Sequence, residues 1–155
     1  MAYMKKKLDI GEIEFDEKEA IYFKFGIPGF EECKRYVLYG AEKFKPLMFI
    51  VGVDTENLRL PVMDPFSFMI DYDPKISRQD MEFLGAKGKE DIAVFVVVTI
   101  PSTGMKDMYA NMLAPILINP DTKLGIQIAL EDDRYKLRQN VIQALQESLG
   151  KMKEK

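Results

Sequence analysis

The sequence contains no histidine among its 155 residues. Histidine is the side chain that most often acts as a general base near neutral pH, and it is the commonest protein ligand of metals. With no histidine and one cysteine, Ser-His-Asp catalysis, Cys-His catalysis and zinc sites are excluded. An enzyme built from this chain would have to work with carboxylates.

Cysteine and long apolar runs are also scarce. Cys33 has no second cysteine to pair with, which fits a reducing compartment. The longest apolar run, residues 92–98, has the length of a strand, whereas a membrane span needs about 18 apolar residues or more. No apolar core of signal-peptide length follows the N-terminal lysines. We therefore expect a cytoplasmic protein that does not enter a membrane.

The length fits a single domain, which we assign to residues 1–155. Residues 1–7 and 151–155 carry six of the 22 basic side chains and one of the 25 acidic ones, and we expect both segments to be flexible basic tails. The remainder then has 16 basic and 24 acidic residues, against a net charge of −3 for the whole chain. Such an acidic body disfavours direct nucleic-acid binding and attracts basic proteins.

Short apolar and β-branched runs alternate with turn residues, which is typical of a mainly β protein. The run 92–100 is nearly all apolar, so we place it in the centre of the sheet, buried on both faces. Residues 113–118 and 124–130 flank Pro120-Asp121 and predict a hairpin. Further strands are expected at 8–15 (kinked or folded into a tight hairpin), 21–27, 36–39, 47–53, 58–63 and 66–72.

Two helices are predicted. Ser77 and Asp80 have the spacing of a capping box, so a short helix should begin there and end at Gly85. At the C-terminus, apolar residues recur with helical spacing through residues 140–153 and predict an amphipathic helix. Gly150 and the lysines that follow it should fray the end of this helix.

The segment from Asn111 to Asn119 is an apolar run interrupted by Pro115. Proline has no N–H to donate, so it is tolerated at a sheet edge, at a strand start or at a bulge. We interpret the segment as an edge or bulge, a place where a β protein can meet a partner.

Four segments carry a motif order that is specific enough to indicate a family. They are 26–30 (Gly-Ile-Pro-Gly-Phe), 60–66 (Leu-Pro-Val-Met-Asp-Pro-Phe), the strand run 92–100, and 110–119 (Ala-Asn-Met-Leu-Ala-Pro-Ile-Leu-Ile-Asn). In this order and spacing they resemble the FliW family of flagellar assembly factors. The resemblance covers about residues 8–138, and the C-terminal amphipathic stretch lies beyond it.

The resemblance implies a mainly β, single-domain antiparallel β-barrel-like fold with one or two short helices, including a C-terminal amphipathic helix. It also implies a cytoplasmic monomer that is not an enzyme and needs no cofactor or metal. Its expected partners are flagellin and CsrA, a translational regulator that represses flagellin mRNA. By holding CsrA, the protein would relieve that repression, without binding nucleic acid itself.

Most of the candidate partner-binding residues come from the motif segments, and Tyr72 and Phe68 lie outside them. Phe30 follows a Pro-Gly turn and is either an exposed aromatic anchor or a plug at the end of the barrel. Asp64 is expected to cap backbone amides, and Asn111 and Asn119 to satisfy the backbone groups around Pro115. The full set is Phe30, Asp64, Pro65, Phe66, Tyr72, Asn111, Pro115 and Asn119, with Phe68 in reserve.

Two acidic clusters, 71–73 and 131–133, stand at the ends of apolar runs. Neither has the oxygen-ligand spacing of a calcium loop, so we interpret them as solvated turns. Two alternative functions stay open. One is a barrel that binds oligonucleotides or oligosaccharides, which the many short strands and 11% aromatic residues suggest. The other is an enzyme that uses carboxylates alone.

Overall fold

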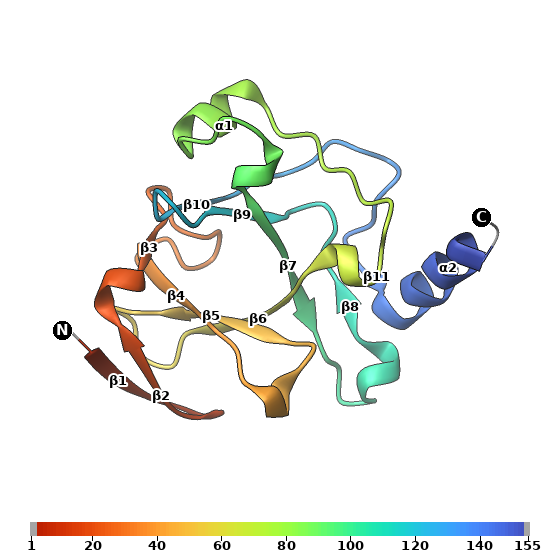
Figure 1. The fold of residues 1–155 in the computed structure, drawn as a ribbon. Coiled ribbons are helices and arrows are strands. Elements are labelled where there is room, and N and C mark those ends of the chain that lie inside the picture. Colours follow the sequence, from red (N-terminus) through yellow and green to blue (C-terminus); the bar gives the residue numbers. More distant parts are fainter. Residues whose placement is uncertain (1–2, 154–155) are drawn as a thin grey trace.

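Seven strands close into a barrel in the computed structural model, which describes residues 3–153 (Figure 1). Strand β7 closes the barrel because it pairs with β6 and also with β9. All neighbours are antiparallel except β3 and β10, which are parallel. The mainly β barrel is thus confirmed. In order around it lie β3 (Ile21–Tyr22), β4 (Arg35–Tyr39), β5 (Met48–Gly52), β6 (Arg59–Met63), β7 (Ala93–Thr99), β9 (Ile116–Asn119) and β10 (Leu124–Gln127).

The other elements extend or cover the barrel. Strands β8 (Tyr109–Ala110) and β11 (Gln139–Asn140) continue the sheet from β7, whereas β1 (Tyr3–Leu8) and β2 (Gly11–Asp16) form a separate hairpin. The α-helices are α1 (Arg78–Phe83) and α2 (Val141–Lys153). Short 3-10 helices occupy Glu17–Glu19, Glu42–Phe44, Pro65–Ser67, Lys89–Asp91 and Met105–Asp107.

The alternation of side chains along β7 explains its nearly unbroken apolar sequence. Phe95 and Val97 belong to the core inside the barrel, whereas Val96 and Val98 belong to a cluster on its outer face. A strand that is covered on both faces needs apolar residues at successive positions. The prediction of a central strand covered on both faces is therefore confirmed.

Three structures cover the outer faces of the barrel on different sides (Figure 1). The β1–β2 hairpin packs over β4 and β5, the turn after α1 packs over β9 and β10, and α2 packs over β7 and β8. Because these faces are apolar, the coverings remove from water a surface that a bare barrel would expose.

Helix α1 begins and ends where the sequence predicts. The Ser77 hydroxyl accepts a hydrogen bond from the backbone N–H of Asp80 at 3.0 Å. Gly85 follows the helix with φ +67°, and a Cβ there would also approach the Thr122 side chain to 2.9 Å. Glycine is thus required at this position for both its backbone conformation and its size.

Helix α2 occupies the predicted residues, and it continues without interruption through Gly150 to Lys153. Two side chains fix it to the loop before α1. The Ser148 hydroxyl donates to the Phe68 carbonyl at 2.9 Å, and Lys151 forms an ion pair with Asp71. These contacts oppose the fraying that Gly150 was expected to cause. Neither helix within residues 3–153 has the length and apolar character needed to cross a bilayer.

Residues 3–7 are not the flexible tail that we predicted, because they form β1 and pair along their whole length with β2. The apolar side chains of this hairpin pack on the barrel, and this burial outweighs the local lysine content. Likewise, residues 151–153 belong to α2. Residues 1–2 and 154–155 of the predicted tails lie outside the described part, and the assignment of residues 1–155 to one domain stays a prediction.

Of two further predicted strands, the one at 66–72 does not form, and the one at 21–27 is shorter than predicted. Residues 66–72 form a 3-10 turn and further turns, because Pro65 begins the turn and the Asp64 carboxylate caps it. The strand predicted at 21–27 ends at Tyr22, since the chain then turns at Gly26, whose φ is +68°. Of the two possibilities for 8–15, a kinked strand or a tight hairpin, the structure has a hairpin with its turn at Asp9-Ile10, but the first strand of this hairpin is β1 and begins before residue 8.

The segment around Pro115 is not a sheet edge, so that interpretation is also wrong. Pro115 is buried and directly precedes β9, which pairs with β7 on one side and with β10 on the other. Proline is tolerated at this strand start, because its missing N–H is not required by the ladder. Its carbonyl accepts a hydrogen bond from Ile128 N–H at 3.1 Å.

Lys6 attaches the hairpin to the barrel by an unusual concentration of hydrogen bonds. Its ammonium group donates to the carbonyls of Gly52, Val53 and Thr55 at 2.7, 2.9 and 2.8 Å. These carbonyls lie where β5 ends, so one side chain satisfies three acceptors there.

We predict that Lys6→Met lowers the free energy of unfolding by about 1–3 kcal/mol, because the three carbonyls lose their donor. Lys5→Met removes the same charge from an exposed position of the same strand and should change it by less than about 0.5 kcal/mol. Urea unfolding followed by circular dichroism measures both. Equal effects of the two substitutions would show that charge, and not the hydrogen bonds, is responsible.

Candidate partner-binding surfaces

The predicted site residues separate into exposed and buried groups. Phe30 and Phe66 have 42% and 43% of their surface exposed, which is high for phenylalanine in a folded protein. Asp64 is exposed and Asn111 is half-buried. The buried members are Pro65, Tyr72, Pro115 and Asn119. The two phenylalanines lie in different hollows, so the structure does not bring the whole set together.

Phe30 stands at the rim of a hollow of about 390 Å³, which we call the barrel-mouth hollow. Leu60 and Val97, which pack against the barrel's interior core, also line it. The rim includes Leu137 and Arg138, from the segment before β11. Of the two interpretations of Phe30, its exposure therefore favours an aromatic anchor over a plug.

The loop that carries Phe30 is held in place by its own backbone. A Cβ at Gly26 would lie 2.7 Å from the Glu31 Cα, so only glycine fits. The Phe30 N–H donates to the Ile27 carbonyl at 2.7 Å, and the Gly29 N–H donates to the Glu31 carboxylate at 2.9 Å. The second bond, from a backbone amide, lowers the pKa of Glu31. The Gly-Ile-Pro-Gly-Phe motif thus positions one aromatic side chain.

Asn111 also lines the barrel-mouth hollow, and its side chain shapes the turn after β8. Its Oδ1 accepts from the Leu113 N–H at 3.0 Å, and its own N–H donates to the Val97 carbonyl at 3.0 Å. The predicted structural role is confirmed by these bonds. The side-chain amide nitrogen is not used in them.

Phe66 lies over a second, smaller hollow of about 180 Å³, the Phe66 hollow. The Asp64 carboxylate accepts from the Phe66 N–H at 2.9 Å, as predicted for a capping residue. The ring of Phe66 lies 6.0 Å from that of Tyr72, centroid to centroid. Ile92 and Val94, at the start of β7, line the same hollow.

Tyr72 and Asn119 are held inside the structure. The Tyr72 hydroxyl donates to the Met112 carbonyl at 2.8 Å, and burial raises the pKa of this hydroxyl. Asn119 is 2% exposed, donates to the Leu84 carbonyl at 2.8 Å and accepts from the Asp121 N–H at 3.0 Å. The polar groups of both side chains are therefore satisfied within the fold, and the Tyr72 side chain also lines the Phe66 hollow.

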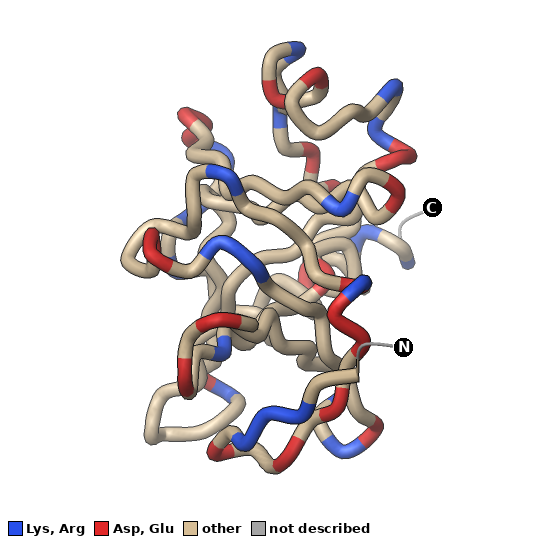
Figure 2. Tube along the Cα trace, turned by 90° about the vertical axis from the view of Figure 1, so that its left-hand side faces the viewer, with Lys and Arg blue, Asp and Glu red and all other residues tan. Residues whose placement is uncertain are grey.

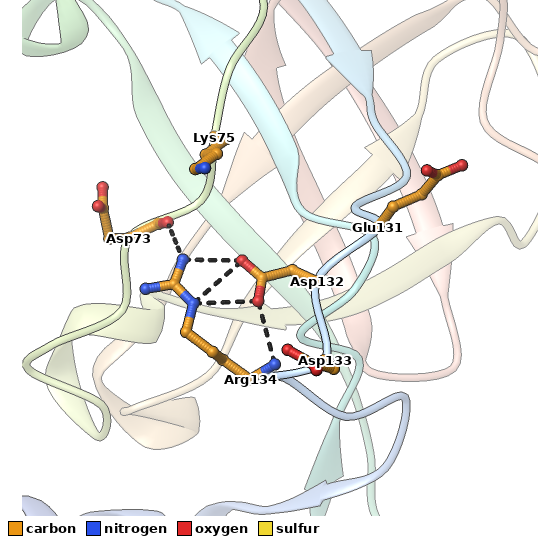
Figure 3. Close-up of a pocket in the computed structure, with 6 residues that line it drawn as sticks. All are labelled: Asp73, Lys75, Glu131, Asp132, Asp133 and Arg134. Atoms are coloured by element: carbon orange, nitrogen blue, oxygen red, sulfur yellow. Dashed lines mark hydrogen bonds and ion pairs between the residues drawn. The ribbon is translucent and has the colours of Figure 1, made fainter.

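The two acidic clusters of the sequence meet in a third, charged hollow of about 740 Å³ (Figure 3). Arg134 lies at its centre, donating to both carboxylate oxygens of Asp132 and to the Asp73 carbonyl. The Arg134 side chain and its backbone N–H lower the pKa of Asp132 to about 2. Within residues 3–153, no group of three or more Asp, Glu, Cys or His side chains is arranged to hold a metal ion.

Basic and acidic residues alternate along much of the chain trace (Figure 2). Because Lys5, Lys6 and Lys7 belong to β1, their charge is part of the folded body and not of a tail. The separation into an acidic body and basic tails is therefore corrected, and the relevant net charge is closer to −3 than to −8. Attraction of a basic partner must then come from local patches.

Leu137 and Arg138 were missed by the sequence analysis. Leu137 has 62% of its surface exposed, more than any other large apolar residue in the described part of the chain. The Arg138 guanidinium packs over the ring of Tyr109, 5.4 Å from its centroid. The available signal was an apolar residue beside a basic one in a segment with no strand or helix pattern.

The closed barrel with its covering elements is the fold of a flagellar assembly factor. It is similar to a crystal structure of the flagellar assembly factor FliW, with a TM-score of 0.81 and 33% sequence identity, covering 90% of this chain and 96% of that one. The flagellar assembly factor FliW of Thermosipho africanus is 36% identical to this chain, over 87% of this chain and 93% of that protein. The flagellar assembly factor FliW of Clostridium tetani is 35% identical to this chain, over 86% of this chain and 91% of that protein.

The model of the FliW protein family matches residues 5–141. The chain belongs to the FliW family, which confirms the resemblance inferred from the motifs. Most of α2 lies beyond the matched residues.

We predict that Tyr72→Phe lowers the free energy of unfolding by about 1–3 kcal/mol, since it leaves the buried Met112 carbonyl without a donor. Tyr22→Phe makes the same chemical change at a side chain that is 45% exposed, and should be nearly neutral. Chemical denaturation of the two variants checks this. If the Tyr72→Phe protein is as stable as the parent, the hydrogen bond from Tyr72 to Met112 does not stabilise the fold.

Proposed function

We propose that this protein is a non-enzymatic assembly factor that binds flagellin and CsrA, and that it relieves CsrA repression of flagellin mRNA. Membership of the FliW family is the observation that carries the proposal. The protein acts as a cytoplasmic monomer and uses no cofactor. Flagellin that accumulates takes the factor from CsrA, so repression returns when flagellin is in excess.

The exposed phenylalanines support a function based on surfaces. Aromatic side chains are enriched among the residues that dominate binding energy at protein interfaces, and singly exposed ones in hollows suit such a role. The barrel-mouth hollow and the Phe66 hollow each offer one such side chain. We assign one partner's main contact to each hollow.

Two separate hollows do not by themselves make the binding of flagellin and CsrA mutually exclusive. A standard interface buries about 800 Å² on each partner, whereas the protein exposes 9436 Å². Two such footprints fit without overlapping, and the two hollows lie against opposite faces of β7. We therefore propose that the bodies of flagellin and CsrA collide outside the hollows, which couples the two binding equilibria.

We predict that adding flagellin to a preformed complex with CsrA releases CsrA in proportion to the flagellin bound. Size-exclusion chromatography with multi-angle light scattering separates the species and gives their masses. A stable assembly containing all three proteins would contradict competition while leaving the two binary interactions intact.

We further predict that Phe30→Ala and Phe66→Ala each weaken one partner about tenfold or more and the other much less, because a truncated aromatic anchor typically costs about 1–2 kcal/mol or more. Phe25→Ala is the matched control, since Phe25 is 59% exposed and lies outside both hollows. Isothermal titration against each partner measures the effects. Unchanged affinities for both partners in both variants would remove the hollows from the binding surfaces.

The two alternative functions make different predictions. An oligonucleotide-binding barrel would shift single-stranded RNA in a gel in the absence of CsrA, whereas our proposal requires no shift. An enzyme based on carboxylates and a metal would show a metal-dependent rise in melting temperature.

A further inference from the structure

The barrel-mouth hollow has a charge pattern that sets it apart from the rest of the surface. Arg138 is the one charged side chain among the residues that line it, although the whole chain has more acidic than basic residues. Arg35, Arg59 and Arg134 are each held by carboxylates of this chain. Within residues 3–153, Arg138 has only the ring of Tyr109 packed beneath its guanidinium.

An arginine stacked on an aromatic ring keeps its N–H donors directed outward. The planar guanidinium matches a carboxylate, to which it can donate two parallel hydrogen bonds. The rim position therefore suits an acidic group on a bound molecule. Among residues 3–153, no carboxylate lines the hollow and competes for Arg138.

The rest of the lining suits an apolar side chain beside that acidic group. Phe30 and Leu137 stand exposed at the rim, and Leu60 and Val97 line the hollow below them. Covering these surfaces with an apolar side chain removes them from water, at about 25 cal/mol for each Å². The volume of about 390 Å³ is near the lower end for ligand pockets, so it admits a short segment and not a folded element.

Two polar side chains complete the fit to a peptide. Gln127 donates its Nε2 to the Ala114 carbonyl at 2.9 Å, which leaves its Oε1 as an acceptor. Asn111 uses its Oδ1 for Leu113, which leaves its Nδ2 as a donor. One acceptor and one donor are what an extended backbone needs for one N–H and one C=O.

We propose that the barrel-mouth hollow binds an extended segment of a partner protein in which a large apolar residue adjoins an aspartate or glutamate. The apolar side chain lies between Phe30 and Leu137, and Arg138 binds the carboxylate. The proposal rests on the proposed function only in that the segment belongs to a protein partner; the ligand chemistry follows from the hollow.

The test is a selection of random heptapeptides, displayed within a longer chain so that both ends are blocked, on the purified protein. We expect enrichment of leucine, isoleucine or phenylalanine next to aspartate or glutamate. The best peptide should bind Arg138→Gln about tenfold or more weakly, since a charge-assisted hydrogen bond is lost. Replacing its acidic residue with the matching amide should cause a similar loss, and the Arg138→Gln protein should no longer distinguish the two peptides.

Arg78→Gln is the matched control, because Arg78 is an exposed arginine of α1 that does not line the hollow. It should leave peptide binding unchanged, and the melting temperatures of both variants should equal that of the parent. Selected peptides without acidic residues, or peptides that bind Arg138→Gln and the parent equally, would overturn the proposal. So would selection only of peptides with a free C-terminal carboxylate, or self-association that buries Leu137.

The selection uses neither flagellin nor CsrA, so its result is independent of whether those proteins bind. Acidic apolar peptides that bind at Arg138, together with failure of both proteins to bind, would refute the proposed function alone. Binding of both proteins that is unaffected by Arg138→Gln, with no peptide selected, would refute this inference alone.

Discussion

The closure of the barrel through β7 is the constraint on which the rest of the structure depends. This strand pairs with β6, β8 and β9, and its two faces belong to different clusters. Val97 points into the core and lines the barrel-mouth hollow, whereas Val94 points outward and lines the Phe66 hollow. One strand thus contributes side chains to both candidate surfaces.

Much of the fold could be predicted because local sequence and tertiary structure agree. Ser77 caps α1, and the apolar run of β7 indicates a strand covered on both faces. The failures arose where a distant partner decides the outcome. Pro115 indicated a sheet edge, because proline is tolerated there, but closure of the barrel gives β9 a paired strand on each side. Lysines 5–7 look like a tail, but they pair in a hairpin, and three distant carbonyls bind Lys6 and hold the hairpin on the barrel.

The candidate site was predictable only in part, since a motif shows which residues matter but not why. Phe30 and Asn119 both came from motif segments, yet one is exposed and the other is buried with its side-chain hydrogen bonds satisfied. Exposure depends on which elements cover a residue, and the sequence pattern does not contain this. Leu137 and Arg138 were missed for the same reason, because their importance comes from lying beside Phe30 and Tyr109 in space.

The loop around Phe30 connects the structure to reversible binding. A binding site that must order itself loses part of its affinity to conformational entropy. Here Gly26 permits a tight turn, and hydrogen bonds within residues 27–33 hold the backbone that carries the Phe30 ring. A preorganised anchor in a small hollow can therefore provide useful affinity without a large interface. The exchange of partners that we propose requires fast dissociation, and differences in affinity between related complexes lie mostly in the dissociation rate.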